Sequence, residues 1–139
     1  MNGVHFYIYK FRTMHMDVDP YCVKPRTLED SRLTSVGKFL RVSCLDELPQ
    51  FINVLKGDMS IVGPRPEMPF IVESYGPLEA QRLLVKPGLT GLWQIYGTRK
   101  QPIHENIHYD FEYIRNRNML LDVSILIKTA FFILKIQNI

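Results

Sequence analysis

The chain has 139 residues, the size of a single domain that can bury roughly two thirds of its unfolded surface. Its formal charge of +3 is mildly basic, and its basic residues are spread along the sequence, which suits anionic ligands or surfaces and argues against a nucleic-acid-binding protein. Two cysteines form no disulfide framework and match no metal-ligand spacing, so the sequence favours a reducing compartment.

No segment predicts a signal peptide or a membrane-spanning helix. Residues 1–10 lack the long apolar region of a signal peptide. The most apolar segment, residues 123–134, is interrupted by Lys128 and is shorter than the about 20 residues that cross a bilayer.

The first 41 residues predict a strand, a loop and a helix, in that order. Residues 6–14 alternate aromatic and β-branched side chains with basic ones, which indicates a short strand with Lys10 and Arg12 on one face. Residues 17–30 carry prolines and many charges and predict an exposed loop. Residues 34–41 predict a short helix with its apolar side chains on one side.

Two adjacent carboxylates, Asp46 and Glu47, stand at an apolar helix start, which is a costly place for ordinary charge. The helix is expected to contain or begin at this pair and to run to Lys56, with Gly57 as its C-cap. In a first turn, free N–H groups and the helix dipole favour ionised carboxylates. The apolar side chains of this helix are expected to face a core: Phe51, Ile52 and Leu55.

A loop rich in glycine and proline follows the acidic pair. Residues 57–66 carry one arginine, Arg65, between two prolines that restrict the backbone. Adjacent helical residues point about 100° apart, so one acid can address a substrate atom while the other holds a metal or an orienting group. Two carboxylates and a rigidly presented guanidinium indicate chemistry on a phosphate.

The middle of the chain predicts short elements. Residues 67–75 and 79–84 are expected to be helical. Residues 87–95 are expected not to stay regular for long, because a proline and two glycines interrupt them. They contain the sole tryptophan, Trp93, for which a core position and a ligand-lining position both stay open.

The C-terminal third predicts two helices. A long helix is expected from Asn106, and residues 122–139 form a segment that is apolar almost all round. Lys128 and Lys135 lie seven residues apart and therefore on one side of it. Such a helix favours a membrane interface or a partner over a plain core position.

One short pattern points to a different chemistry. His104, Glu105 and His108 match the zinc-hydrolase pattern H-E-x-x-H. A five-residue pattern is common by chance, and the sequence offers no obvious third ligand. A solvated amphipathic helix start explains these residues more simply.

Six segments occur together in the order and spacing of one protein family: residues 10–14, 33–41, 45–50, 53–60, 62–66 and 86–94. Through these segments the chain resembles the bacterial sugar transferases, which are monotopic polyprenyl-phosphate phosphoglycosyl transferases. The resemblance covers nearly the whole chain, and several motifs in register make it specific.

The resemblance implies an α+β fold: a helix-dominated single domain, residues 1–139, with a short β element and amphipathic helices of the monotopic membrane-interface type. It implies a location at the cytoplasmic face of the inner membrane. Family members carry a hydrophobic membrane-entering helix before the segment at 10–14, so a catalytic domain truncated at its N-terminus is expected.

The implied activity is transfer of a sugar 1-phosphate from a UDP-sugar to undecaprenyl phosphate, with release of UMP and with Mg²⁺ as cofactor. Asp46 would be the nucleophile that forms a phosphosugar-aspartyl intermediate, and Glu47, with Asp46, would hold the metal. The residues expected to bind substrate are Lys10, Arg12, Arg41, Arg65 and Asp110.

Two alternatives remain beside this activity: an inactive remnant that still binds a UDP-sugar, and the less favoured zinc hydrolase using His104 and His108. No nucleic-acid partner is expected, and assembly as a homo-oligomer is left open. The sugar cannot be read from the sequence, because many residues set the pocket shape that selects it.

Overall fold

A two-stranded parallel sheet lies at the centre of the fold. β1 (Ser60–Val62) pairs with β2 (Gly88–Thr90), with Ser60 opposite Gly88 and Val62 opposite Thr90. The computed structural model describes residues 3–19, 22, 25, 27–97 and 106–136, with the side chains of 135 and 136 left out.

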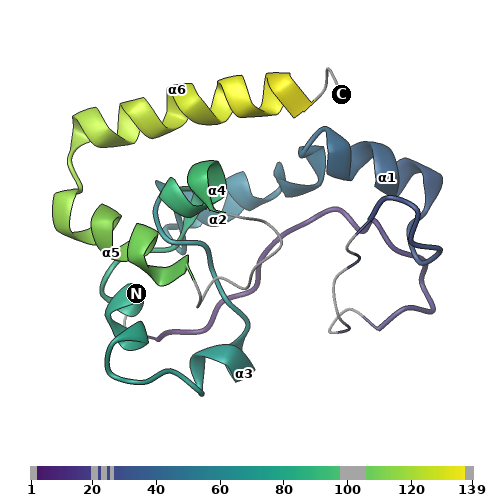
Figure 1. Cartoon of the computed structure of the whole chain (residues 1–139). Helices are drawn as coiled ribbons and strands as arrows, with labels where there is room; N and C mark the ends of the chain where they lie inside the picture. The colour runs from purple at the N-terminus through teal and green to yellow at the C-terminus, as the bar shows by residue number, and fades with distance from the viewer. Residues whose placement is uncertain (1–2, 20–21, 23–24, 26, 98–105, 137–139) are drawn as a thin grey trace.

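Helices make up most of the described chain. They are α1 (Ser35–Val42), the 3₁₀ helix η1 (Leu45–Glu47), α2 (Gln50–Lys56), α3 (Pro69–Val72), the 3₁₀ helix η2 (Glu79–Leu84), α4 (Leu92–Tyr96), α5 (Ile107–Asn116) and α6 (Met119–Ile136) (Figure 1). This confirms the prediction of a helix-dominated fold with a short β element. Within the described residues, no helix combines the length and apolar character needed to span a bilayer.

The core lies where β1 meets three of the later helices. Its buried side chains come from β1, α4, α5 and α6: Val62, Leu92, Tyr113 and Ile125. The Tyr113 hydroxyl oxygen is 3.2 Å from the carbonyl oxygen of Val62 and 3.0 Å from Asp122 Oδ1. Burial, together with the hydrogen bond to Asp122, raises the pKa of Tyr113 to about 12. The α6 helix, which runs along the upper side of Figure 1, is thereby fixed to the sheet through α5.

The N-terminal segment is not a strand, so that prediction is wrong. Residues 4–13 are extended without a partner strand, and the described chain there forms only an isolated antiparallel bridge between Met14 and Leu33. The segment (purple in Figure 1) runs from the α5 side of the molecule towards α1. It bonds to helix residues instead of a sheet, through Phe11 N–H to the Asp46 carbonyl and through the side chain of Asn53.

The expectation that α2 turns its apolar side chains to a core is also wrong. Phe51 and Ile52 are each 48 % exposed and Leu55 is 88 % exposed. The buried face is polar and includes Asn53, which is fully buried. The reason is long-range: the Asn53 amide satisfies backbone groups of the N-terminal segment, and this bonding decides which face of α2 is covered.

The remaining predicted elements differ from the observed ones mainly in length. The helix at 34–41 is confirmed as α1, with the Thr34 side chain accepting a hydrogen bond from Gly37 N–H. Residues 67–75 contain only the four-residue α3. The segment 87–95 divides into β2 and α4, as its breaking residues predict.

Candidate active site

The acidic pair occupies a turn of its own. Asp46 and Glu47 lie in η1, and Pro49 precedes α2, so the pair stands before α2. The prediction that both acids lie in the first turn of that helix is therefore wrong. Cys44, just before η1, has φ 57°, a left-handed conformation that is uncommon outside glycine. This turn buries Asp46, which is 4 % exposed, and leaves Glu47 half-buried beside it.

Two cations from distant parts of the chain meet the acidic pair. Lys10 Nζ lies 3.1 Å from Asp46 Oδ2 and 2.9 Å from Glu47 Oε1, so one ammonium bridges both carboxylates. Arg65 Nη2 donates to the same Glu47 oxygen at 3.2 Å. The structure therefore brings together four of the residues that the sequence singled out.

The charges around Glu47 set its ionisation. Burial alone would raise its pKa, but the positive charges of Arg65 and Lys10 and their hydrogen bonds outweigh that effect and lower the pKa from 4.5 to about 2. Glu47 is therefore a carboxylate throughout the physiological pH range.

Asn53 positions Lys10, although sequence reasoning did not select it. Its Oδ1 accepts from Tyr9 N–H at 3.0 Å, and its Nδ2 donates to the Tyr7 carbonyl at 2.7 Å. Phe11 N–H donates to the Asp46 carbonyl at 3.0 Å on the other side of Lys10. Backbone bonds on both sides thus hold Lys10 against the pair. The only sequence signal was the place of Asn53 in the segment 53–60.

Asp110 lies in a second buried cluster and not at the acidic pair. Its Oδ2 accepts a 2.6 Å hydrogen bond from Arg82 Nε. Burial raises the pKa of Asp110, and the Arg82 charge offsets this only in part. Arg82 Nη2 donates to the Arg65 carbonyl at 2.9 Å, so the cluster contacts the site through the main chain of Arg65.

Arg12 and Arg41 are held elsewhere. Arg12 Nη1 lies 3.4 Å from the His15 carbonyl at the surface. Arg41 Nε donates to Thr13 Oγ1 at 3.0 Å. Neither has a contact with the acidic pair among the described residues, and their roles in substrate binding stay predictions.

Trp93 lies beside the arginine of the site. The Arg65 guanidinium carbon is 6.0 Å from the centre of the Trp93 ring. Among the residues that the structure describes, Trp93 Nε1 and the side-chain amide atoms of Gln94 are buried without a hydrogen-bond partner. Trp93 thus contributes to the surroundings of Arg65, and a ligand-lining role stays open.

A metal at the acidic pair would need ligands from outside the protein. Within the described ranges, no three His, Cys, Asp or Glu side chains are grouped closely enough to hold an ion. Mg²⁺ commonly takes one or two carboxylates and completes its shell with substrate phosphates and water. The ionised Glu47 beside Asp46 fits that pattern. His104 and Glu105 of the zinc pattern lie outside the described residues, so that hypothesis stays untested.

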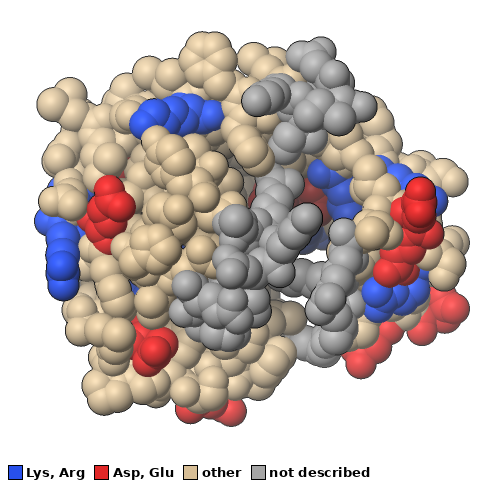
Figure 2. All heavy atoms as spheres, viewed as in Figure 1, with Lys and Arg blue, Asp and Glu red and all other residues tan. Residues whose placement is uncertain are grey.

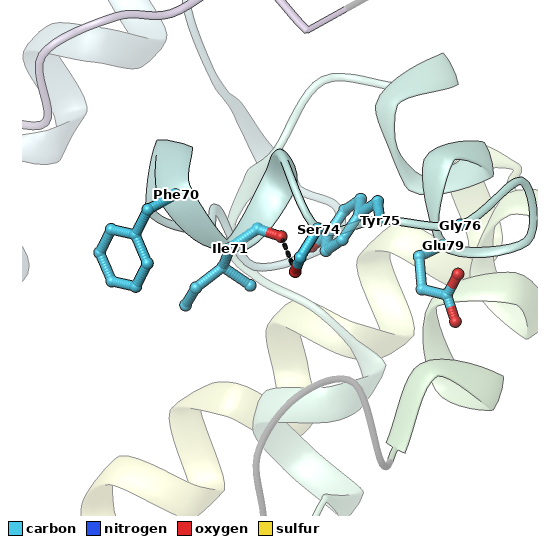
Figure 3. A pocket seen from close by; sticks show the side chains of 6 residues that line it. All are labelled: Phe70, Ile71, Ser74, Tyr75, Gly76 and Glu79. Carbon is cyan, nitrogen blue, oxygen red and sulfur yellow. Dashed lines mark hydrogen bonds between the residues drawn. The ribbon is translucent and has the colours of Figure 1, made fainter.

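An open hollow lies between α3 and η2 (Figure 3). Its volume is about 430 Å³, and it is lined by Phe70, Ile71, Ser74, Tyr75, Gly76 and Glu79. On its wall, Ser74 Oγ donates to the Ile71 carbonyl three residues earlier at 2.7 Å, as the dashed line shows. None of the predicted site residues lines it.

The family follows from comparison with known proteins. The chain belongs to the bacterial sugar transferase family, whose model matches residues 1–136. It is 39 % identical over 149 residues to the undecaprenyl-phosphate galactose phosphotransferase of Salmonella typhimurium, covering 96 % of this chain and 31 % of that protein.

Two further relatives are named as UDP-glucose:undecaprenyl-phosphate glucose-1-phosphate transferases. The one from Klebsiella pneumoniae is 44 % identical over 139 residues, which is 94 % of this chain and 30 % of that protein. The one from Caulobacter vibrioides is 38 % identical over 146 residues, which is 99 % of this chain and 55 % of that protein. The chain thus spans about a third of the length of the Salmonella and Klebsiella proteins.

Proposed function

We propose that this domain transfers a sugar 1-phosphate from a UDP-sugar to undecaprenyl phosphate and releases UMP. The observation that carries the proposal is the contact of Asp46 and Glu47 with Lys10 and Arg65, since two acids and two cations suit phosphoryl transfer. The relatives' names support these substrates. In this proposal residues 1–139 are one catalytic domain.

Asp46 is the proposed nucleophile. One of its carboxylate oxygens attacks the sugar-proximal phosphorus of the UDP-sugar, and the bond from that phosphorus to the bridging oxygen breaks. UMP leaves with the bridging oxygen, and the sugar phosphate stays on Asp46 as an acyl phosphate. An oxygen of the lipid phosphate then attacks the same phosphorus and frees the Asp46 carboxylate. Two displacements replace one difficult transfer.

Lys10 and Arg65 are the proposed phosphate-binding cations. The Lys10 ammonium bridges the two carboxylates, and an arriving pyrophosphate competes for it. When the Lys10 side chain moves to the phosphate, it frees the Asp46 carboxylate. Its positive charge then lies beside the phosphoryl group that Asp46 attacks. Arg65 offers a planar fork that stabilises the charge developing on the phosphoryl oxygens.

Glu47 is the proposed metal-binding acid, with Asp46 as a second ligand. The low pKa of Glu47, about 2, keeps it ionised and ready to bind a cation. When bound, Mg²⁺ neutralises charge on the pyrophosphate. Arg12, Arg41 and Asp110 complete the proposed set of substrate-binding residues, with Asp110 acting through Arg82 and the Arg65 main chain instead of by direct contact.

Exposed apolar helix faces support a position at a membrane surface, which in this proposal is the cytoplasmic face of the inner membrane. Large apolar side chains point to solvent from three helices: Val36 and Phe39 on α1, Phe51, Ile52 and Leu55 on α2, and Leu120, Val123, Ile127 and Phe131 on α6. On the face shown in Figure 2, uncharged surface predominates over scattered charges of both signs. Apolar helix faces of this kind bind at the boundary between headgroups and acyl chains, where the lipid phosphate is presented.

The test is release of UMP from a panel of UDP-sugars with undecaprenyl phosphate and Mg²⁺. We expect turnover with at least one sugar and no turnover by Asp46→Asn. The matched control is Asp17→Asn, an exposed aspartate that should leave the rate unchanged. Full activity of Asp46→Asn would contradict the assignment of Asp46 as the nucleophile. Binding of a UDP-sugar without release of UMP would favour the alternative of an inactive remnant that still binds a UDP-sugar.

A further inference from the structure

We infer that Arg82 is a positioning residue that fixes the main chain of Arg65 and so aims the Arg65 guanidinium at the reaction site. The inference rests on the proposed function, because it assigns Arg82 a role in the same phosphate chemistry. Arg82 acts through Arg65 and does not itself contact the acidic pair.

Arg82 is buried and joins three parts of the chain. It is 5 % exposed, and its Nε donates to Asp110 on α5 at 2.6 Å. Its Nη2 donates to the Arg65 carbonyl at 2.9 Å, and its Nη1 donates to the Tyr75 hydroxyl. A guanidinium presents its donors in one rigid plane, so these bonds fix its position and direction together.

The peptide groups on both sides of the Arg65 Cα are held by hydrogen bonds from two different parts of the chain. The Pro64 carbonyl accepts from Gly88 N–H on β2 at 2.8 Å, which fixes the peptide before Arg65. The Arg65 carbonyl accepts from Arg82, which fixes the peptide after it. Pro66 already restricts Arg65 to extended conformations. With both flanking peptides held, the backbone of Arg65 has one orientation and its side chain one starting direction.

The Arg82–Asp110 ion pair is better explained by the positioning of Arg65 than by a contribution to the stability of the fold. A buried ion pair such as Arg82–Asp110 adds little net stability compared with apolar residues of the same volume. What this pair does is hold a guanidinium where it reaches the carbonyl of a site arginine. Arg65 in turn reaches Glu47 at 3.2 Å. A displacement of about 1 Å at such a group can cost about a hundredfold in rate.

The test uses Arg82→Lys, which keeps a positive charge for Asp110 but replaces the planar fork, whose Nε and Nη2 reach Asp110 and the Arg65 carbonyl separately, with a single nitrogen. We expect kcat for UMP release to fall by about ten- to a hundredfold, more than KM for the UDP-sugar rises. In an Arg65→Ala background the same substitution should lower kcat no further. Arg115→Lys, an exposed arginine on α5, should leave kcat unchanged.

A readout independent of turnover comes from the sole tryptophan, which lies 6.0 Å from the Arg65 guanidinium carbon. Arg65→Ala should change the Trp93 emission, and Arg82→Lys should change it in the same direction. Adding Arg82→Lys to Arg65→Ala should change it no further. If the wild-type protein releases no UMP, the proposed function fails, and the emission series still decides the role of Arg82.

Two results would overturn the inference. One is an Arg82→Lys variant that melts at a lower temperature but keeps wild-type kcat and emission. The other is an effect of Arg82→Lys that is as large without Arg65 as with it. Should Arg82→Lys not fold, Tyr75→Phe replaces it, because this change removes only a hydroxyl partner of Arg82. It should lower kcat severalfold with Arg65 present and not at all without it.

Discussion

The side-chain amide of Asn53 donates a hydrogen bond to the carbonyl oxygen of Tyr7 at 2.7 Å, joining positions 46 residues apart in the sequence. The same side chain accepts from Tyr9 N–H, so one buried amide holds the extended segment that carries Lys10. The contact between Lys10 and the acidic pair therefore depends on a residue that touches neither carboxylate.

Asn53→Ala should disturb both stability and the site. Loss of the bonds to Tyr7 and Tyr9 leaves partly buried backbone groups without partners, so the free energy of unfolding should fall by about 1–3 kcal/mol. The rate of UMP release should fall as well, because Lys10 loses its position. Urea unfolding and the UMP assay measure the two effects. Asn116→Ala, which removes an exposed amide on α5, should change neither, and a wild-type rate for Asn53→Ala would contradict the positioning of Lys10.

Glu47→Gln should change stability in a pH-dependent way. Because the folded pKa is about 2 and the ordinary value is 4.5, ionised Glu47 stabilises the fold above pH 4.5, and this contribution disappears as the pH falls towards 2. At neutral pH the substitution should cost up to about 3 kcal/mol, at about 1.4 kcal/mol per pKa unit. Urea unfolding of both proteins across this range should show the difference shrinking on acidification. A difference that stays constant with pH would argue against the low pKa.

Gly37→Ala should separate the N-terminal segment from α1. A Cβ atom at Gly37 would lie 2.0 Å from the carbonyl oxygen of Thr13, and backbone atoms cannot move aside locally. We expect the free energy of unfolding to fall by about 1–3 kcal/mol, the usual cost of overpacking. Thermal unfolding measures this, with Ser35→Ala at the exposed start of α1 as the control. Unchanged stability of Gly37→Ala would mean that this close approach is not maintained.

Leu55→Asp should weaken binding to lipid vesicles. Leu55 is the most exposed apolar residue of α2, and its replacement by a carboxylate opposes insertion of that face. Burial of one leucine is worth about 1.5–3 kcal/mol, so the partition coefficient should fall by about tenfold or more. Sedimentation with vesicles containing anionic lipid measures it. Gln81→Asp adds the same charge on η2 and should have a smaller effect, and equal losses would show a general charge effect instead of docking through α2.

Local signals in the sequence were sufficient for several elements. The Thr34 cap starts α1 where expected, and Gly57 ends α2 in a left-handed conformation, φ 82°. Capping and backbone conformation depend on neighbours along the chain, which is why a single sequence predicts them. The adjacency of Asp46 and Glu47, and the rigid setting of Arg65 between prolines, are likewise properties of the sequence itself.

Only the tertiary structure decided which faces are buried and which charges meet. The sequence could not predict that α2 buries Asn53 and exposes Leu55, or that Asp110 pairs with Arg82. Nor could it show that Lys10 bridges both acids from an extended segment. These outcomes depend on hydrogen bonds and ion pairs between residues 28 to 46 positions apart, which local periodicity does not encode. The sequence thus determines which chemical groups the site contains, and long-range packing brings them together.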